Sequence, residues 1–127
     1  MTSQHMGIVL FAHGSRDPLW RAPIDAVAKT IATQSPECVV RCAFLELTTP
    51  DLPSTVDELV SLGMTGVRIV PMFLGVGRHA REDLPELVAQ LRHQHPSLAI
   101  ELMPSVGEHP AMTQLMAQIA LGATPNP

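Results

Sequence analysis

Residues 7–12 read GIVLFA, a continuous apolar run that ends directly at His13-Gly14-Ser15. An apolar run without alternation predicts a strand buried on both faces, as in parallel sheets. Three further β-rich runs follow, at residues 38–45, 66–74 and 98–103. Stretches with helical periodicity come after each run, at residues 19–34, 54–62, 80–94 and 111–121. Four β-α units in succession predict a parallel sheet with helices on both faces.

For a chain of 127 residues, this pattern predicts one α/β domain of three layers. We expect a four-stranded parallel sheet in the flavodoxin-like order 2-1-3-4. The core is expected to run from residue 7 to residue 121, with residues 1–6 and 122–127 flexible. Aromatic residues make up only 3% of the sequence, so the core must be aliphatic.

Four residues predict local features of the second and third β-α units. Pro71 lies inside the third predicted strand, where proline removes a ladder hydrogen bond, so we expect a bulge or an early end of pairing there. Asp51 or Ser54 is expected to cap the second helix. Gly63 is expected to end it, because glycine adopts the left-handed conformation that often terminates helices.

Composition narrows the class of partner. The net charge of −4 and the absence of a basic run argue against nucleic acid. No apolar run approaches the ~20 residues of a membrane span, and the N-terminus lacks the basic region of a secretion signal. Cys38 and Cys42 are spaced too widely for a C-x-x-C pair, and we expect them to be reduced core residues. We therefore expect a cytoplasmic protein that binds neither nucleic acid nor membrane.

Three polar residues follow the first three predicted strands. His13 follows the first strand, Glu46 the second, and His79 lies in the predicted loop after the third. In the order 2-1-3 these loops are adjacent, at strand spacings of ~4.8 Å. Two imidazoles and a carboxylate suit a divalent ion such as Co²⁺, Fe²⁺, Ni²⁺ or Zn²⁺. The alternative is that each is an ordinary polar loop residue.

Other histidine and glycine patterns fit less well. A His-Gly after a first strand also occurs in phosphohistidine phosphatases, but they place arginine directly before the histidine, where this chain has Ala12. Gly75-Val76-Gly77 is not a G-x-G-x-x-G fingerprint, and we interpret it as backbone against which a flat ligand can lie. His93 and His95 are expected at or just past a helix end, solvated or near its dipole.

Taken together, these residues resemble the class II tetrapyrrole chelatases, specifically the small CbiX-type sirohydrochlorin cobaltochelatases and their ferrochelatase relatives. The resemblance extends from about Gly7 to Leu121. It is carried by three motifs: FAHGSRDP at 11–18, FLELTTPDL at 44–52 and FLGVGRHAREDLP at 73–85. The third motif is the most specific.

The resemblance implies an enzyme that inserts Co²⁺ or Fe²⁺ into sirohydrochlorin without nucleotide hydrolysis, in cobalamin or sirohaem biosynthesis. Co²⁺ is the metal we expect first, and Ni²⁺ shares its ligand preferences. The resemblance also implies that His13 and His79 bind the incoming metal and that Glu46 is the acidic residue of the site. Because the short family members pair, it implies a homodimer.

Further residues around this site have two interpretations each. Arg16, Arg78 and Arg81 either pair with carboxylates of the tetrapyrrole or are solvated surface charges. Asp83 either orients the His79 ring or is an acidic residue favoured near a helix N-terminus.

A histidine or Glu46 is the candidate general base for the pyrrole protons. The rival function is a metal or tetrapyrrole carrier without turnover.

Overall fold

The structure is a computed structural model that describes residues 6–122, apart from the side chain of His79. Its elements are β1 (Met6–Ala12), α1 (Ala22–Gln34), β2 (Val39–Phe44), α2 (Leu52–Ser61), β3 (Gly66–Pro71), α3 (Arg78–Gln94), β4 (Ala99–Leu102), the 3₁₀ turn η1 (Val106–Glu108) and α4 (Pro110–Ala120). The expected flexible ends lie outside the described residues, except that Met6 begins β1 and Gly122 follows α4.

The four strands form one parallel sheet in the order β2-β1-β3-β4, which confirms the predicted topology. β1 lies at the centre and pairs with strands on both sides: Gly7 is aligned with Val39 of β2 and with Val67 of β3. The chain therefore switches direction across the sheet between β1 and β3. Loops that follow these two strands are neighbours at the carboxyl edge, where ligands bind in such sheets.

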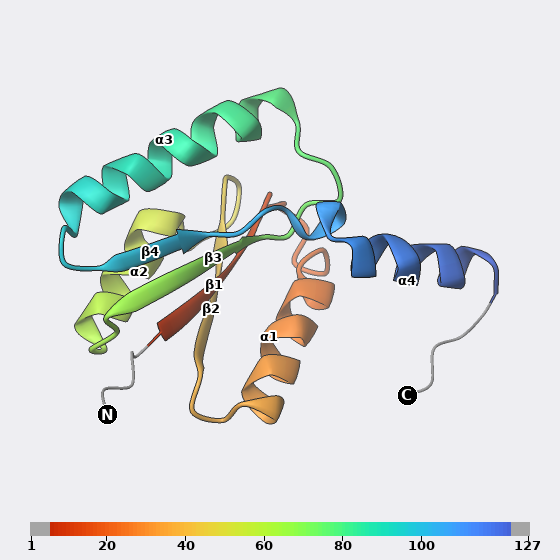
Figure 1. The fold of residues 1–127 in the computed structure, drawn as a ribbon, viewed down its shortest axis with the longest axis horizontal. Coiled ribbons are helices and arrows are strands. Elements are labelled where there is room, and N and C mark those ends of the chain that lie inside the picture. The colour runs from red at the N-terminus through yellow and green to blue at the C-terminus, as the bar shows by residue number, and fades with distance from the viewer. Residues whose placement is uncertain (1–5, 123–127) are drawn as a thin grey trace.

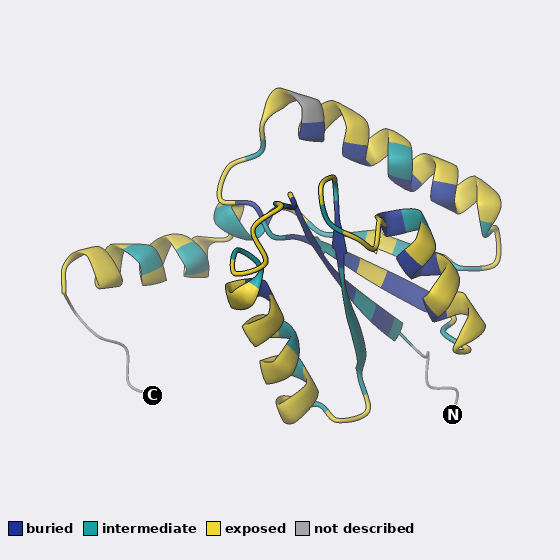
Figure 2. Cartoon of the chain, turned by 180° about the vertical axis from the view of Figure 1, so that it is seen from behind, coloured by how far each residue is buried: buried dark blue, intermediate teal, exposed yellow. Residues whose placement is uncertain are grey.

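Helices cover both faces of the sheet, so the three-layer prediction is confirmed (Figure 1). α2 and α3 pack on one face over a large aliphatic cluster that includes Val9, Val67 and Ile69. α1 packs on the other face over a smaller cluster around Leu10 and Phe44. Figure 2 shows the result, with buried residues concentrated on the strands and on the inner sides of α2 and α3. α4 lies to one side of these layers.

The element ends differ from the predicted ones by a few residues, each for a local reason. β3 ends at Pro71, short of the predicted residue 74, as expected of an early end of pairing near the proline. One hydrogen bond to β1 continues past it, from Met72 N to the carbonyl of Phe11 at 2.7 Å. α2 begins after Asp51, whose carboxylate accepts a hydrogen bond from Ser54 N at 2.9 Å. Gly63 follows α2 with a φ of +92°, as expected of a helix terminator.

α3 begins two residues earlier than predicted, which corrects the position of the second histidine. Gly77, in extended conformation, is the residue before the helix, so Arg78 and His79 belong to its first turn and not to the preceding loop. A glycine without a capping side chain gives little sequence signal for a helix start.

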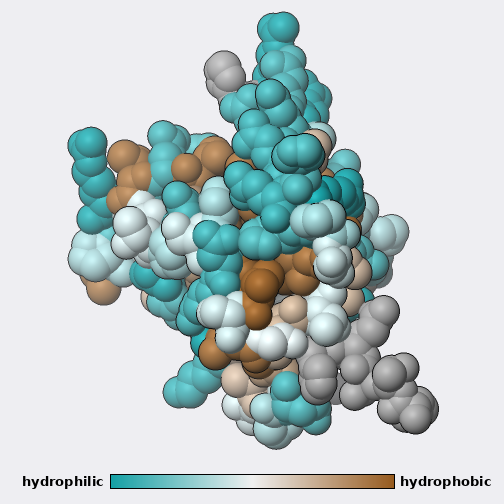
Figure 3. Space-filling model, turned by 90° about the vertical axis from the view of Figure 1, so that its left-hand side faces the viewer, coloured by the Kyte–Doolittle hydropathy of each residue, from teal (hydrophilic) through white to brown (hydrophobic). Residues whose placement is uncertain are grey.

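The amino edge of the sheet faces the viewer in Figure 3, where hydrophobic surface is recessed between hydrophilic side chains. A hollow of about 360 Å³ there is lined by Val60, Met64 and Leu98 beside His95. Cys38 and Cys42 form no disulfide with one another and are half-buried, so they lie at the margin of the core and not inside it as predicted. Across the described part of the chain, no helix is long and apolar enough to cross a membrane.

Candidate metal and tetrapyrrole site

The loops after β1 and β2 are held together by backbone hydrogen bonds that continue beyond the strands. Leu45 N donates to the carbonyl of Ala12 at 2.9 Å, and Glu46 N donates to the carbonyl of His13 at 3.1 Å. Strand pairing therefore extends one step past the sheet on this side. It places His13 and Glu46 next to one another at the carboxyl edge.

Gly14 is required by the close approach of these loops. Its φ is +104°, and a Cβ added there would lie 1.7 Å from the carbonyl oxygen of Glu46. Any other residue would push the second loop away. The H-G pair of the first motif therefore fixes the position of Glu46 as well as that of His13.

The side chains of His13 and Glu46 face each other at the solvent-exposed surface. His13 Nε2 lies 3.6 Å from Glu46 Oε1, and the side chains are 58% and 56% exposed. Phe73 packs edge-on against the His13 ring, with centroids 6.1 Å apart. The imidazole is thus supported on one side by an aromatic ring, and its Nε2 is turned toward a carboxylate and solvent. Both groups are accessible to an incoming cation.

A cavity of about 580 Å³ surrounds this pair and joins residues from three loops and the start of α3. Its lining comprises His13, Leu45, Glu46, Phe73, Gly75, Gly77, Arg78, Ala80 and Asp83. A Cβ added to Gly75 or Gly77 would meet nothing within 4 Å, so both glycines border open space. His13 and Glu46 therefore converge with the backbone that follows the third strand, and Gly77 borders room for a ligand.

The position of His79 is known only from its backbone, because its side chain lies outside the described residues. It stands between Arg78 and Ala80, which both line the cavity. Its pairing with His13, and its proposed hydrogen bond with Asp83, stay predictions. Among the side chains that are described, no three of His, Cys, Asp or Glu lie close enough together to hold an ion.

The three arginines are placed differently. Arg78 lines the cavity and pairs with Glu82 at 3.2 Å, with its side chain 81% exposed. Arg81 lies one turn further along α3, exposed and outside the cavity lining. Arg16 lines a different hollow of about 650 Å³, formed by the same two loops that carry His13 and Glu46. Thr48 Oγ1 joins these loops there: it accepts a hydrogen bond from Ser15 N and donates one to the carbonyl of Ser15.

Arg21 also borders the hollow that contains Arg16, but it is engaged within the protein. Its guanidinium lies 4.7 Å over the ring of Phe44 and hydrogen-bonds Asp25. This hydrogen bond raises the pKa of Arg21 above its usual value. Arg16 is exposed in the same hollow and is the better placed of the two for an anionic ligand.

Sequence reasoning missed the apolar part of the lining, namely Leu45, Phe73 and Ala80. Phe73 opens the third motif, two residues after the strand that ends at Pro71. An aromatic residue at that point was the available signal, since the chain contains few aromatics.

The chain is similar in sequence to known chelatases. The family model described as CbiX matches residues 7–121. The chain is 35% identical over 86 residues to the sirohydrochlorin cobaltochelatase of Methanococcoides burtonii, covering 68% of this chain and 66% of that protein. It is 27% identical over 100 residues to the sirohydrochlorin ferrochelatase of Bacillus subtilis, of which it covers 38%. The matched part is thus just under two thirds of the first relative.

Solved structures share the fold. A CbiX protein of Marinobacter aquaeolei, assigned to cobalamin biosynthesis, superposes with a TM-score of 0.79 at 27% identity, over 92% of this chain and 95% of that chain. The sirohydrochlorin chelatase SirB of Bacillus subtilis subspecies spizizenii, solved in complex with cobalt, superposes with a TM-score of 0.75 at 24% identity. The match covers 91% of this chain and 50% of SirB.

Proposed function

Because the chain belongs to the CbiX family, we propose that it inserts a divalent metal ion, Co²⁺ or Fe²⁺, into sirohydrochlorin without hydrolysing a nucleotide. The observation that carries the proposal is the exposed His13–Glu46 pair at the carboxyl edge, inside a cavity bordered by glycine backbone. We take residues 1–127 as one chelatase-like domain, with its core at residues 7–121, that works in the cytoplasm as a homodimer.

His13 is proposed to hold the incoming metal through Nε2, with His79 as the second ligand. A neutral imidazole binds Co²⁺ and Fe²⁺ but gives them up more readily than a thiolate cage does. The exposure of His13 supports this role, because an ion that is cargo must enter and leave. The metal is a substrate here, and the macrocycle nitrogens replace the histidines as its ligands.

Glu46 is proposed to act as the general base. Insertion of a dication into a free-base macrocycle releases two pyrrole protons, so that the charge of the ring system balances the metal. A carboxylate 3.6 Å from the ligand nitrogen of His13 lies near the point where these protons leave. Its exposed side chain can pass them on to solvent.

The walls of the cavity are proposed to bind the macrocycle. Its flat face lies against Gly75 and Gly77, where no side chain intervenes, with the ring of Phe73 beside His13. The carboxylates of sirohydrochlorin pair with Arg78, Arg16 and Arg81. Arg78 must exchange Glu82 for the ligand, which costs little because both partners are exposed.

An absorbance assay tests the proposal. Sirohydrochlorin is mixed with Co²⁺, Fe²⁺ or Ni²⁺, with and without protein, in nucleotide-free buffer and with the Fe²⁺ samples kept anaerobic. We expect the protein to accelerate insertion of Co²⁺ or Fe²⁺ over the spontaneous rate. If it binds metal or tetrapyrrole without acceleration, the chain is a carrier and the enzymatic proposal is wrong.

Two substitutions test the assigned roles in the same assay. Glu46→Gln should lower turnover by about tenfold or more while leaving the affinity for Co²⁺ nearly unchanged, because it removes a base and keeps the shape. His79→Ala should weaken Co²⁺ binding. Glu37→Gln, a matched change in the exposed turn before β2, is the control. Unchanged kinetics in Glu46→Gln would reduce Glu46 to a bystander.

A further inference from the structure

Leu47 has two unfavourable features at once, one in its backbone and one in its side chain. Its φ is +65°, and it is the one non-glycine residue in the described part of the chain with a positive φ. Residues with a Cβ are strained in this left-handed region, which glycine and asparagine adopt more readily. The leucine side chain is also 53% exposed, so burial does not offset the strain. Both features occur next to Glu46 and point to a role outside the packing of the fold.

Hydrogen bonds on either side hold Leu47 in this conformation. Before it, Glu46 N donates to the carbonyl of His13 at 3.1 Å. After it, Thr48 Oγ1 accepts from Ser15 N at 3.1 Å and donates to the Ser15 carbonyl at 2.6 Å. The two loops therefore pair through backbone atoms up to Glu46 and through the threonine side chain beyond Leu47. A strained residue persists where contacts of this kind determine its conformation from both sides.

The turn at Leu47 places consecutive residues of one loop in two different hollows. Glu46 lines the cavity that contains His13, whereas Leu47 lines the hollow of about 650 Å³ that contains Arg16. A glycine at position 47 would make the same turn without strain, but it would give this hollow no apolar side chain. The leucine therefore adds an exposed apolar surface to a hollow that also contains a cation.

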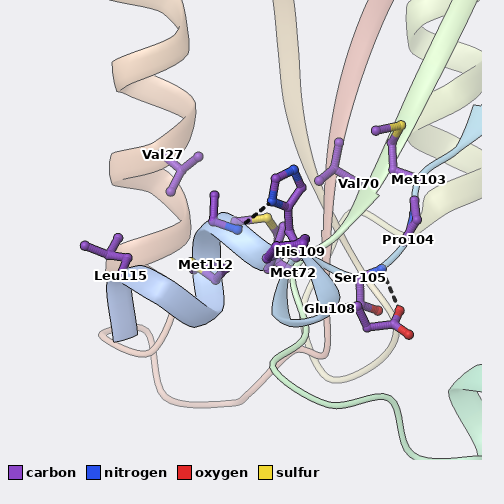
Figure 4. A pocket seen from close by; sticks show the side chains of 13 residues that line it. Val27, Val70, Met72, Met103, Pro104, Ser105, Glu108, His109, Met112 and Leu115 are labelled. Carbon is purple, nitrogen blue, oxygen red and sulfur yellow. Dashed lines mark hydrogen bonds between the residues drawn. The ribbon is translucent and has the colours of Figure 1, made fainter. Parts of the chain in front are cut away.

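Charge distinguishes this hollow from the apolar groove beside α1 (Figure 4). That groove, of about 590 Å³, is lined by Val27 of α1, Val70 of β3 and Met112 of α4. The described residues that line it include Glu108 but neither arginine nor lysine, so they offer no permanent cation to an anionic ring. A ligand with an apolar body and carboxylates therefore fits the hollow of Leu47 better.

We propose that Leu47 is a substrate-binding residue, whose side chain packs against the apolar edge of the macrocycle while Arg16 pairs with a carboxylate on that edge. The inference rests on the proposed function and adds a specific contact to it. A tetrapyrrole has an apolar ring with carboxylates around its rim, so one edge presents both kinds of group to the hollow. Because Leu47 directly follows Glu46, an edge held there keeps the ring beside the proposed metal site.

Binding of metal-free sirohydrochlorin, followed by anaerobic absorbance titration, tests the inference. Leu47→Asn keeps a residue that tolerates the left-handed turn and removes the apolar surface, so we expect binding to weaken by about tenfold or more. Leu47→Met keeps an apolar side chain of similar size and should bind within about twofold of the wild type. Leu62→Asn makes the same change at a leucine that is 50% exposed at the end of α2, and it should bind like the wild type. Wild-type affinity in Leu47→Asn overturns the inference.

Stability and salt distinguish substrate binding from a role in the fold. The urea midpoint of Leu47→Asn should equal or exceed that of the wild type, because strain is relieved and little buried surface is lost. A clearly lower midpoint would mean that Leu47 supports the fold, and would overturn the inference. Raising NaCl from about 0.05 M to about 0.5 M should reduce the effect of Arg16→Gln on binding but not that of Leu47→Asn, since salt screens charges. An effect of Leu47→Asn that disappeared in salt would contradict an apolar contact.

Binding and insertion are measured separately, so the two proposals can fail separately. A wild type that binds sirohydrochlorin without accelerating insertion contradicts the proposed enzyme, and weaker binding by Leu47→Asn still supports the contact. A wild type that inserts metal, with Leu47→Asn binding sirohydrochlorin equally well, contradicts the contact alone. A wild type that binds no sirohydrochlorin contradicts both.

Discussion

Two histidine–carboxylate pairs lie at opposite edges of the sheet. They consist of the same kinds of side chain but differ in spacing and exposure. His13 and Glu46 at the carboxyl edge are 3.6 Å apart, and both are more than half exposed. His95 and Asp57 at the amino edge are 3.0 Å apart, and the His95 side chain is only 20% exposed. The first pair is loose and open to a ligand, whereas the second is closed.

The elements that carry each pair explain the difference. Asp57 belongs to α2, and His95 is the residue at which α3 ends, so their hydrogen bond ties together two helices on one face of the sheet. His13 and Glu46 sit on loops that the backbone already holds together, so their side chains are not needed for that purpose. A site that exchanges ions requires the open arrangement of His13 and Glu46.

Removing one histidine from each pair should therefore have opposite effects. His13→Ala should reduce metal insertion by at least about 100-fold through the loss of a ligand, while the free energy of unfolding changes by less than about 0.5 kcal/mol. His95→Ala should destabilise the fold by about 1 kcal/mol and leave insertion unchanged. Urea unfolding and the sirohydrochlorin assay measure the two quantities. Equal activity losses in both variants would contradict the comparison.

Each edge also has a glycine in the left-handed conformation, and the two glycines differ in how closely other backbone approaches them. Gly14 and Gly63 both have a positive φ, but only at Gly14 would an added Cβ collide with backbone. Gly14→Ala should destabilise the fold by about 2 kcal/mol and lower metal insertion, because Glu46 is displaced. Gly63→Ala carries the conformational strain alone and should cost about 1 kcal/mol with full activity. If Gly63→Ala impaired insertion equally, loop displacement would not be the cause.

The sheet and the first site residues were predictable because their signals are local. Four apolar runs separated by helical periodicity predicted the strand order, and His13 and Glu46 directly follow two of these runs. His95 was predicted to be solvated or near a helix dipole. Its bond to Asp57 joins residues 38 positions apart, and single-sequence patterns carry no such information.

The course of α4 could not be predicted for a related reason. An amphipathic pattern indicates that a helix face will be buried, but it does not indicate against which surface. The direction of α4 depends on the contact between Gly107 and the Leu74 carbonyl, which joins the loops after β3 and β4. The start of α3 before His79 was missed because a glycine cap resembles a loop glycine.

The smallest expected effect concerns Asp51, a carboxylate at the carboxyl edge of the sheet. It stabilises the start of a helix and has no proposed part in metal insertion. Asp51 caps α2, and its hydrogen bonds from Ser54 hold the pKa of Asp51 below its usual value. Its contribution is therefore present above the unfolded-state pKa of about 3.9 and is lost as pH falls through the lower folded pKa. Asp51→Ala should cost about 1 kcal/mol near neutral pH.

The same reasoning gives the pH dependence of this cost. Urea unfolding of the wild type and Asp51→Ala should show a gap in stability that is constant near neutral pH and narrows once the pH falls below about 4. Metal insertion by Asp51→Ala should match the wild type, because Asp51 does not line the cavity. A gap that persisted in acid would mean that the lost contribution is packing and not the charged cap. A loss of insertion would mean that the start of α2 positions Glu46, and the two roles at this edge would no longer be separable.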